Sequence, residues 1–336
     1  LNAGTLKLGT ANALPSGAGK GNVNIAGNNF GSTTGGTAPG TIPAPGVLDM
    51  GGFDQAINGL NSTTGGFVTN TPSTAANTTN TLHVGNNNAS SSFDGVIQDG
   101  YAVAANSSTI SPSFFNGGIN LHKVGSGTLT LNGANTFSGT TVVDAGKLVV
   151  GGGVSGSLNG VVNVNAGTLG GSGSTTGGVT IGNGTGGSDA FIAPGNSTGT
   201  FTTTFSLSLL SDATYQFELN STTALADKIV ANGVSLNSSA LFSFTDLGSA
   251  VLATNGSVVF TIIDNTSGSA ISGQFANLPN GVRFTSNGNT YLPSYAGGTG
   301  NDLTLTVVPE PGTLSSLVGA LAPLLGWSRY RRRNGR

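Results

Sequence analysis

Short runs in which apolar and polar residues alternate recur along the chain at nearly regular intervals. Three of them directly follow a glycine turn, at Gly127-Thr-Leu-Thr-Leu, Gly146-Lys-Leu-Val-Val and Gly167-Thr-Leu. The leading glycines are spaced almost evenly, and a similar unit, Gly4-Thr-Leu-Lys, opens the chain. Alternation with a period of two indicates strands, and short strands that recur every ~20 residues are typical of a solenoid. The pattern therefore predicts an all-β fold, a parallel β-helix.

Further runs of alternating apolar residues predict additional strands. They lie at residues 161–165, 179–181, 201–207, 215–219, 241–244 and 258–263. Two other segments are predicted to be loops, the proline-rich residues 37–45 and the Asn-, Ser- and Thr-rich residues 70–92. From Asp212 onward the aromatic residues increase and the spacing loosens. We therefore expect a β-solenoid at 1–211 and a C-terminal β-region that closes it at 212–306.

The composition agrees with a β-solenoid and excludes several other classes. The 336 residues include 57 glycines, and only 7% of residues are charged, against roughly 25% in an average soluble domain. The residues that favour helices are scarce, with Glu218 and Glu310 the two glutamates of the sequence. A helical bundle is excluded, and a doubly wound α/β enzyme is not expected. Glycine and asparagine suit the corners between strands because they tolerate positive φ.

The charge is unevenly distributed. Five of the eleven cationic residues lie within the last eight positions, so the rest of the chain carries six cations against 13 Asp and Glu. Such an acidic body offers no electrostatic surface for nucleic acid, and no nucleic-acid partner is expected. Cysteine is absent, which removes disulfides, thiolate metal sites and thiol catalysis. Because the chain starts at Leu1 without a signal segment, we interpret it as the C-terminal part of a longer precursor.

The C-terminal segment 307–336 is distinct from the body and has three parts. The first is the extended motif Val308, Pro309, Glu310 and Pro311, and the second is an apolar stretch at 312–327. That stretch predicts a short transmembrane helix, about 24 Å long at ~1.5 Å per residue. The residues assigned to this membrane helix are Gly312, Leu314, Leu317, Val318, Leu321, Leu324, Leu325 and Trp327. The third part, 328–336, is a basic stop signal made of Arg329, Arg331, Arg332, Arg333 and Arg336.

Residues 123–148 resemble the autotransporter-associated β-strand repeat. The segments that follow, at 166–173, 192–197, 215–219 and 260–264, are similar to the stalk of autotransporter passengers. This resemblance covers most of residues 1–306. It implies a right-handed parallel β-helix exposed at a cell surface, and it implies no particular chemistry. A true autotransporter would continue into a membrane β-barrel, whereas only the short segment 307–336 follows Thr306 here.

The tripartite tail resembles a PEP-CTERM sorting signal, the bacterial surface-sorting element. The resemblance implies an exosortase-type processing enzyme as a partner, with cleavage near Pro309–Pro311. It also implies transient contact with the inner membrane of a Gram-negative bacterium. The arginines, and with them the tail, would be cytoplasmic before processing, while the body is exported. The alternative interpretation is an ordinary short membrane anchor with stop-transfer arginines.

Candidate chemical sites are few. His83 and His122 are far apart in the sequence and lack a nearby carboxylate-rich motif, and the acidic residues are scattered singly along the body. The sequence from Gly17 to Lys20 lacks features of a phosphate-binding loop. Residues 297–302 imitate a calcium-binding repeat turn, but the pattern occurs once, whereas such sites need stacked neighbours. We therefore expect no catalytic residue, cofactor or metal site.

The sequence as a whole predicts a secreted or cell-surface β-solenoid with a structural or adhesive role, and not an enzyme. The alternative is an extracellular β-helix that binds or cleaves polysaccharide, which would make such a polysaccharide its partner. Carboxylates and aromatic side chains that converge on one lateral groove would favour this alternative. A passive spacer for a domain upstream is a third interpretation.

Overall fold

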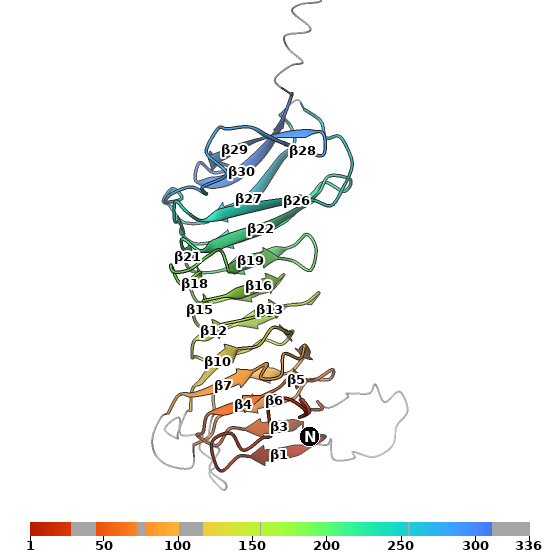
Figure 1. Cartoon of the computed structure of the whole chain (residues 1–336), viewed down its shortest axis with the longest axis vertical. Coiled ribbons are helices and arrows are strands. Elements are labelled where there is room, and N and C mark those ends of the chain that lie inside the picture. Colours follow the sequence, from red (N-terminus) through yellow and green to blue (C-terminus); the bar gives the residue numbers. More distant parts are fainter. Residues whose placement is uncertain (28–44, 73–77, 101–116, 155, 255, 311–336) are drawn as a thin grey trace, which may run out of the picture.

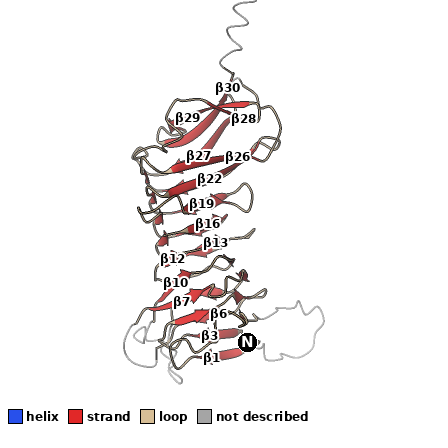
Figure 2. Cartoon of the chain, viewed as in Figure 1, coloured by secondary structure: helices blue, strands red, loops and turns tan. Residues whose placement is uncertain are grey.

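The computed structural model describes residues 1–27, 45–72, 78–100, 117–154, 156–254 and 256–310. Every regular element in these ranges is a β-strand, and most neighbouring strands are parallel. The strands stack into an elongated column, with the N-terminal strands at one end and the last strands at the other (Figure 1; Figure 2). The prediction of an all-β, mostly parallel solenoid is confirmed. Within the described ranges no helix could cross a membrane.

One turn of the solenoid contains three short strands. In the middle of the column these are β12 (Thr141–Val143), β13 (Lys147–Val150) and β14 (Ser157–Leu158). The next turn contributes β15 (Val162–Val164), β16 (Gly167–Gly171) and β17 (Ser174–Thr175). Each strand pairs in parallel with its counterpart one turn later. The column therefore has three faces, each formed by parallel strands that stack along its length.

The first and second faces are continuous sheets. The first contains, in spatial order, β4 (Gln55–Ile57), β7 (Asn80–Val84), β10 (Ile119–Lys123), β12, β15, β18 (Val179–Ile181), β21 (Leu207–Leu209) and β25 (Val234–Leu236). The second contains β8 (Ser91–Phe93), β11 (Thr128–Leu131), β13, β16, β19 (Ala190–Pro194), β22 (Ala213–Asn220) and β26 (Leu241–Asp246). A short strand, β23 (Leu225–Ala226), folds back antiparallel onto the end of β22.

The third face is formed by two sheets in succession. The first sheet contains β1 (Gly4–Lys7), β3 (Gly46–Asp49), β6 (Phe67–Thr69) and β9 (Val96–Ile97). The second sheet begins with the strands β14, β17, β20 (Thr200–Thr203), β24 (Lys228–Ala231) and β27 (Val259–Asn265). Residues 134–136 connect them, because the Thr136 N–H donates to the Ile97 carbonyl and Ala134 bridges Ser157. Near the N-terminus, β2 (Val23–Asn24) pairs with β5 (Leu60–Asn61).

The predicted repeat is present, but its length varies. The register places Leu129, Leu148, Leu169, Ile192 and Tyr215 in one inward column on successive strands of the second face, and all five side chains are fully buried. On the first face, Leu121 pairs with Thr141 and Thr141 with Val162, which agrees with the spacing of the predicted repeat. Later turns lengthen, since Val179 pairs with Leu207. Loops of different length at the corners absorb this variation without disturbing the inward column.

The strands stop being parallel at the C-terminal end of the third face. There β27 pairs antiparallel with β30 (Asp302–Val308), which pairs with β29 (Asn289–Gly297), and β29 pairs with β28 (Phe284–Ser286). Parallel pairing thus continues beyond Asp212, through β26 and β27. This end of the column contains an aromatic cluster of Tyr215, Phe217, Phe242, Phe244, Phe275, Phe284 and Tyr291. It fills the end of the core with large side chains.

Two local predictions were wrong. Residues 70–92 were expected to be a loop, yet they contain β7 and most of β8, because Leu82, Val84 and Phe93 still point into the core. Residues 201–207 were expected to be one strand, but a bend after Thr203 divides them between β20 and β21 on different faces. The strands at 80–84 and 91–93 were missed because polar residues separate their apolar ones. The division of 201–207 was missed because the corner lies within a run of polar residues. Most of the predicted loop at 37–45 lies outside the described residues.

Candidate functional site

The predicted sorting motif begins where the last strand ends. Val308 is the final residue of β30 and pairs with Thr290 in β29, while Pro309 and Glu310 follow it without regular structure. Proline has no backbone N–H to donate, which is consistent with pairing that stops at this point. Pro311 lies outside the described residues, and so do the predicted membrane-helix positions and the five arginines of the predicted basic end.

A shallow hollow lies on the outer side of the second face. Small residues occupy two neighbouring outward positions at its edge, since Gly170 pairs with Ala193, which lines the hollow. The stem of Lys147 lies across Gly170, so a Cβ added to that glycine would be 2.9 Å from the lysine Cε. Next to Ala193, β22 presents Gln216 and Glu218 outward, because residues 215, 217 and 219 point into the core.

The hollow is lined mainly by polar groups. It encloses about 130 Å³ between Lys147, residues 193–197, Gln216, Glu218 and Asp227. Five of these residues carry polar side chains with no hydrogen bond or ion pair to any other described residue: Lys147, Asn196, Ser197, Gln216 and Glu218. Such side chains are free to bind something else.

Asp227 holds the wall of this hollow in place. It follows β23, and its side chain is buried beside β22. Its Oδ1 accepts the Gly199 N–H at 2.8 Å, and its Oδ2 accepts the Glu218 N–H at 2.9 Å. Burial raises the pKa of this carboxyl to about 7; the two N–H donors lower it, and the Glu218 charge raises it. Because both oxygens are already engaged by backbone, Asp227 shapes the site more than it contacts a ligand.

An aromatic side chain flanks the hollow. Phe191 pairs with Thr168, which pairs with Lys147, so all three lie in one outward row of the second face. Phe191 is half-buried, whereas Ile192 beside it is completely buried in the core. The second face therefore offers an apolar ring surface close to the polar side chains of the hollow.

The sequence did not predict this hollow, because its acidic residues were expected to lie singly. Glu218 and Asp227 come together through the hairpin of β22 and β23. Lys147 comes from three turns earlier in the same sheet. The hairpin could have been inferred from the polar run after Leu219, but the contribution of Lys147 depends on turn lengths that the sequence does not reveal.

The two histidines also come together. His83 pairs with His122 on adjacent strands of the first face, with ring centroids 5.0 Å apart in an edge-to-face arrangement. The Nδ1 of His122 lies 3.7 Å from Asp144 Oδ2. Burial lowers the pKa of His83, and His122 lowers it further, while Asp54 and Asp144 raise it. No group of three or more His, Cys, Asp or Glu that could hold a metal ion is found in the described part of the chain.

Lys123 is a fully buried cation at a corner of the column. Its Nζ donates to the carbonyls of Val124 and Gly125, both at 2.7 Å, and of Ala145 at 3.1 Å. Burial lowers the pKa of this ammonium to about 8. Since Ala145 belongs to the following turn, the lysine joins two turns by satisfying carbonyls that need a donor.

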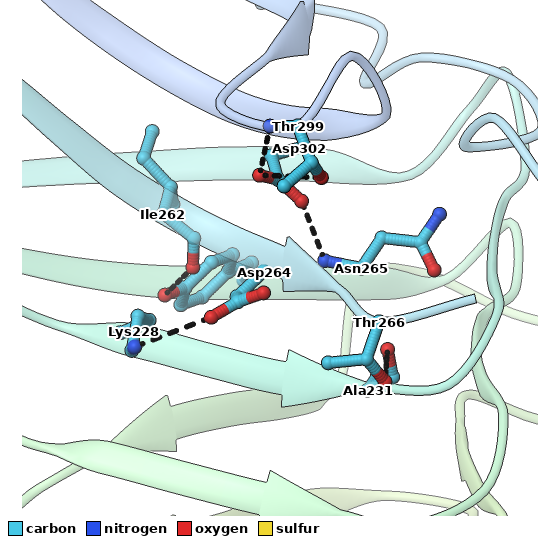
Figure 3. A network of polar contacts seen from close by, with 9 residues as sticks. Lys228, Ala231, Ile262, Asp264, Asn265, Thr266, Thr299 and Asp302 are labelled. Carbon is cyan, nitrogen blue, oxygen red and sulfur yellow. Dashed lines mark hydrogen bonds and ion pairs between the residues drawn. The ribbon is translucent and has the colours of Figure 1, made fainter. Parts of the chain in front are cut away.

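The turn at 297–302 is a structural corner. The Oδ1 of Asp302 accepts the Asn265 N–H at 2.9 Å, and its Oδ2 accepts the Thr299 N–H at 3.1 Å (Figure 3). Nearby, Lys228 and Asp264 form an ion pair at 3.4 Å. The oxygens of Asp302 that a calcium ion would need are thus already used by backbone donors.

The comparisons relate part of the chain to a known family. A search of curated proteins finds no match. Residues 121–150 match the family described as the passenger-associated-transport-repeat. They run from Leu121 in β10 to Val150 at the end of β13, which is one complete turn of the column followed by the first-face and second-face strands of the next turn. This match supports the resemblance of the repeats to autotransporter-associated repeats and indicates an exported, cell-surface, passenger-like repeat protein of a Gram-negative bacterium.

Proposed function

We propose that the chain is a cell-surface or secreted β-solenoid with a structural or adhesive role, wound in the right-handed sense of autotransporter passengers. The observation that carries this proposal is the passenger-associated-transport-repeat at 121–150, which is part of the continuous column and pairs with the turns before and after it. A column of this kind gains stability from contacts between neighbouring turns, and its length can hold a binding surface away from the cell. Its outer rows are mainly neutral and polar, as in residues 163, 180, 208 and 235 of the first face.

We infer that the protein works without catalysis. In support, the buried Asp227 and Asp302 have both carboxylate oxygens engaged by N–H donors. Among the described residues that line the hollow, this leaves Glu218 as the one free carboxylate, whereas glycoside hydrolysis uses two carboxyls that both reach the substrate. His83 and His122, which contact each other, have no nucleophilic serine or cysteine among their side-chain partners in the described residues.

We further propose that residues 307–336 are a sorting signal read by an exosortase-type enzyme, with transient insertion of 312–327 into the inner membrane. The proposal is supported by the sequence of the tail and by the end of β30 at Val308, directly before Pro309. A processing enzyme could bind a segment that begins where pairing stops without first unfolding the solenoid. The mature body would then be released to, or held at, the cell surface.

Loss of the tail should depend on the Val308–Pro311 motif. In a Gram-negative host that carries an exosortase, we expect the mature chain to end near Pro309–Pro311 by intact-mass measurement of pulse-labelled protein. The triple variant Pro309→Ala, Glu310→Ala, Pro311→Ala should retain the tail, because the motif that the enzyme reads is gone. The matched control Pro279→Ala, at a turn outside the tail, should be processed normally. Retention of the complete tail by the unaltered chain in such a host would contradict the proposal.

A further inference from the structure

We propose that the hollow on the second face is a binding site for a neutral sugar unit of an extracellular polysaccharide. The hollow is defined by Lys147, residues 193–197, Gln216, Glu218 and Asp227. It is a lateral site on the column, far in sequence from the sorting motif. A sugar site would give the proposed adhesive role a class of ligand. This inference rests on the proposed function in one respect, namely that the protein meets the polysaccharide outside the cell.

The chemistry of the lining fits hydroxyl groups. Lys147 can only donate hydrogen bonds, the Glu218 carboxylate can only accept them, and the Gln216 amide can do both. A sugar hydroxyl also donates and accepts, so adjacent hydroxyls can use all three side chains at once. A phosphate would meet the Glu218 carboxylate, and a cationic ligand would meet Lys147. The opposed charges therefore favour a neutral polyhydroxyl ligand over either ion.

Several buried polar side chains outside the hollow are used differently. Asn58, Asn135 and Asn265, for example, are buried and hold the backbone of neighbouring turns through several hydrogen bonds each. Lys147 and Gln216 make no such contact within the described residues, although they are only half-exposed. The same holds for the side chain of Glu218, while Asp227 supplies the structural bonds in its place. This division leaves a wall that backbone hydrogen bonds already hold in place, with side-chain donors and acceptors that a ligand can use.

Phe191 adds an apolar surface to the same row. A pyranose ring has a face of C–H groups as well as an edge of hydroxyls, and an aromatic ring can pack against that face. Ala193 is small and keeps the floor of the hollow low, while the Lys147 stem covers Gly170 beside it, so a sugar ring would lie over Ala193. The hollow is open, and the outer surface of the column continues on both sides of it. The neighbouring units of a polysaccharide can therefore extend beyond the hollow along this surface.

The test is binding of oligosaccharides to the purified full-length chain. The probes are neutral hexasaccharides of glucose, mannose and galactose, together with hexagalacturonate and inorganic phosphate, measured by isothermal titration calorimetry. We expect at least one neutral hexasaccharide to bind. Glu218→Gln and Lys147→Met should each raise its Kd at least tenfold, since each removes one charged partner and keeps most of the side-chain volume. Asp189→Asn and Lys20→Met, at exposed positions without side-chain partners among the described residues, are the matched controls and should leave the Kd unchanged.

The outcomes separate this proposal from the proposed function. If no neutral hexasaccharide binds, if only hexagalacturonate or phosphate binds, or if neither variant weakens binding, the sugar site is wrong. Thermal unfolding of both variants by circular dichroism shows whether a loss of binding reflects loss of fold, and a binding loss with unfolding in both would also count against the proposal. Cell-surface placement and tail processing do not depend on any of these results and are measured separately.

Discussion

Replacing Gly171 with alanine should destabilise the solenoid by about 3 kcal/mol or more. Gly171 ends β16 at a buried corner with a φ of +100°, a backbone conformation that costs a residue with a Cβ about 1–2 kcal/mol. A Cβ at this position would also lie 2.1 Å from the Val150 carbonyl oxygen of the preceding turn. Because that neighbour is backbone, it cannot move aside as a flexible side chain could, so the turns must separate. The measurement is the urea midpoint of unfolding followed by circular dichroism.

Gly186→Ala is the matched control for that substitution. Gly186 has a similar positive φ, +87°, but no atom lies within 4 Å of its Cβ position. It should therefore show only the conformational cost, about 1–2 kcal/mol. Equal shifts of the urea midpoint for the two variants would mean that the turns do not approach each other closely at Gly171. The strand register given for β13 and β16 would then be wrong.

Phe217→Ala should cost about 3–5 kcal/mol, the usual range for removing a buried aromatic side chain. Phe217 is 1% exposed and lies within the aromatic cluster at the C-terminal end of the core. Its ring centroid is 6.0 Å from Tyr215, 5.4 Å from Phe242 and 5.6 Å from Phe244. Because β22 and β26 carry these rings and are joined by backbone pairing, the cavity cannot collapse without loss of strand contacts. Urea unfolding measures the loss.

The control for this prediction is Phe205→Ala. Phe205 lies at the bend between β20 and β21 and is 60% exposed, so its removal should change the urea midpoint little. If Phe205→Ala were as costly as Phe217→Ala, the aromatic cluster would not be the packed end of the core.

The fold was largely predictable because its repeat is visible in the apolar spacing. The glycines at 127, 146 and 167 precede Leu129, Leu148 and Leu169, which pair in register in the structure. Residues 179–181 form a strand with the predicted bounds. The prediction failed where polar residues dominate, as in β7 and β8, because strand and turn compositions are alike in an Asn-, Ser- and Thr-rich chain.

The candidate site was not predictable for a different reason. A side chain on the outer row of a solenoid has neighbours one turn away, and the turns of this chain differ in length. Lys147, Glu218 and Asp227 meet only because β13, β16, β19 and β22 stack in one register and β23 folds back beside them. His83 and His122 face each other for the same reason, although they are far apart in the sequence. Local sequence determines which residues point outward, but the turn lengths determine which of them become neighbours.

The central claim is that this column of stacked turns is displayed outside the cell. It is tested most directly by inserting an epitope tag between Gly186 and Gly187, an exposed corner where no atom lies within 4 Å of either Cβ position. In a Gram-negative host that carries an exosortase, antibody should label the tag on intact, unpermeabilised cells or in the medium. Labelling that appears only after the outer membrane is permeabilised, with none in the medium, would contradict the claim.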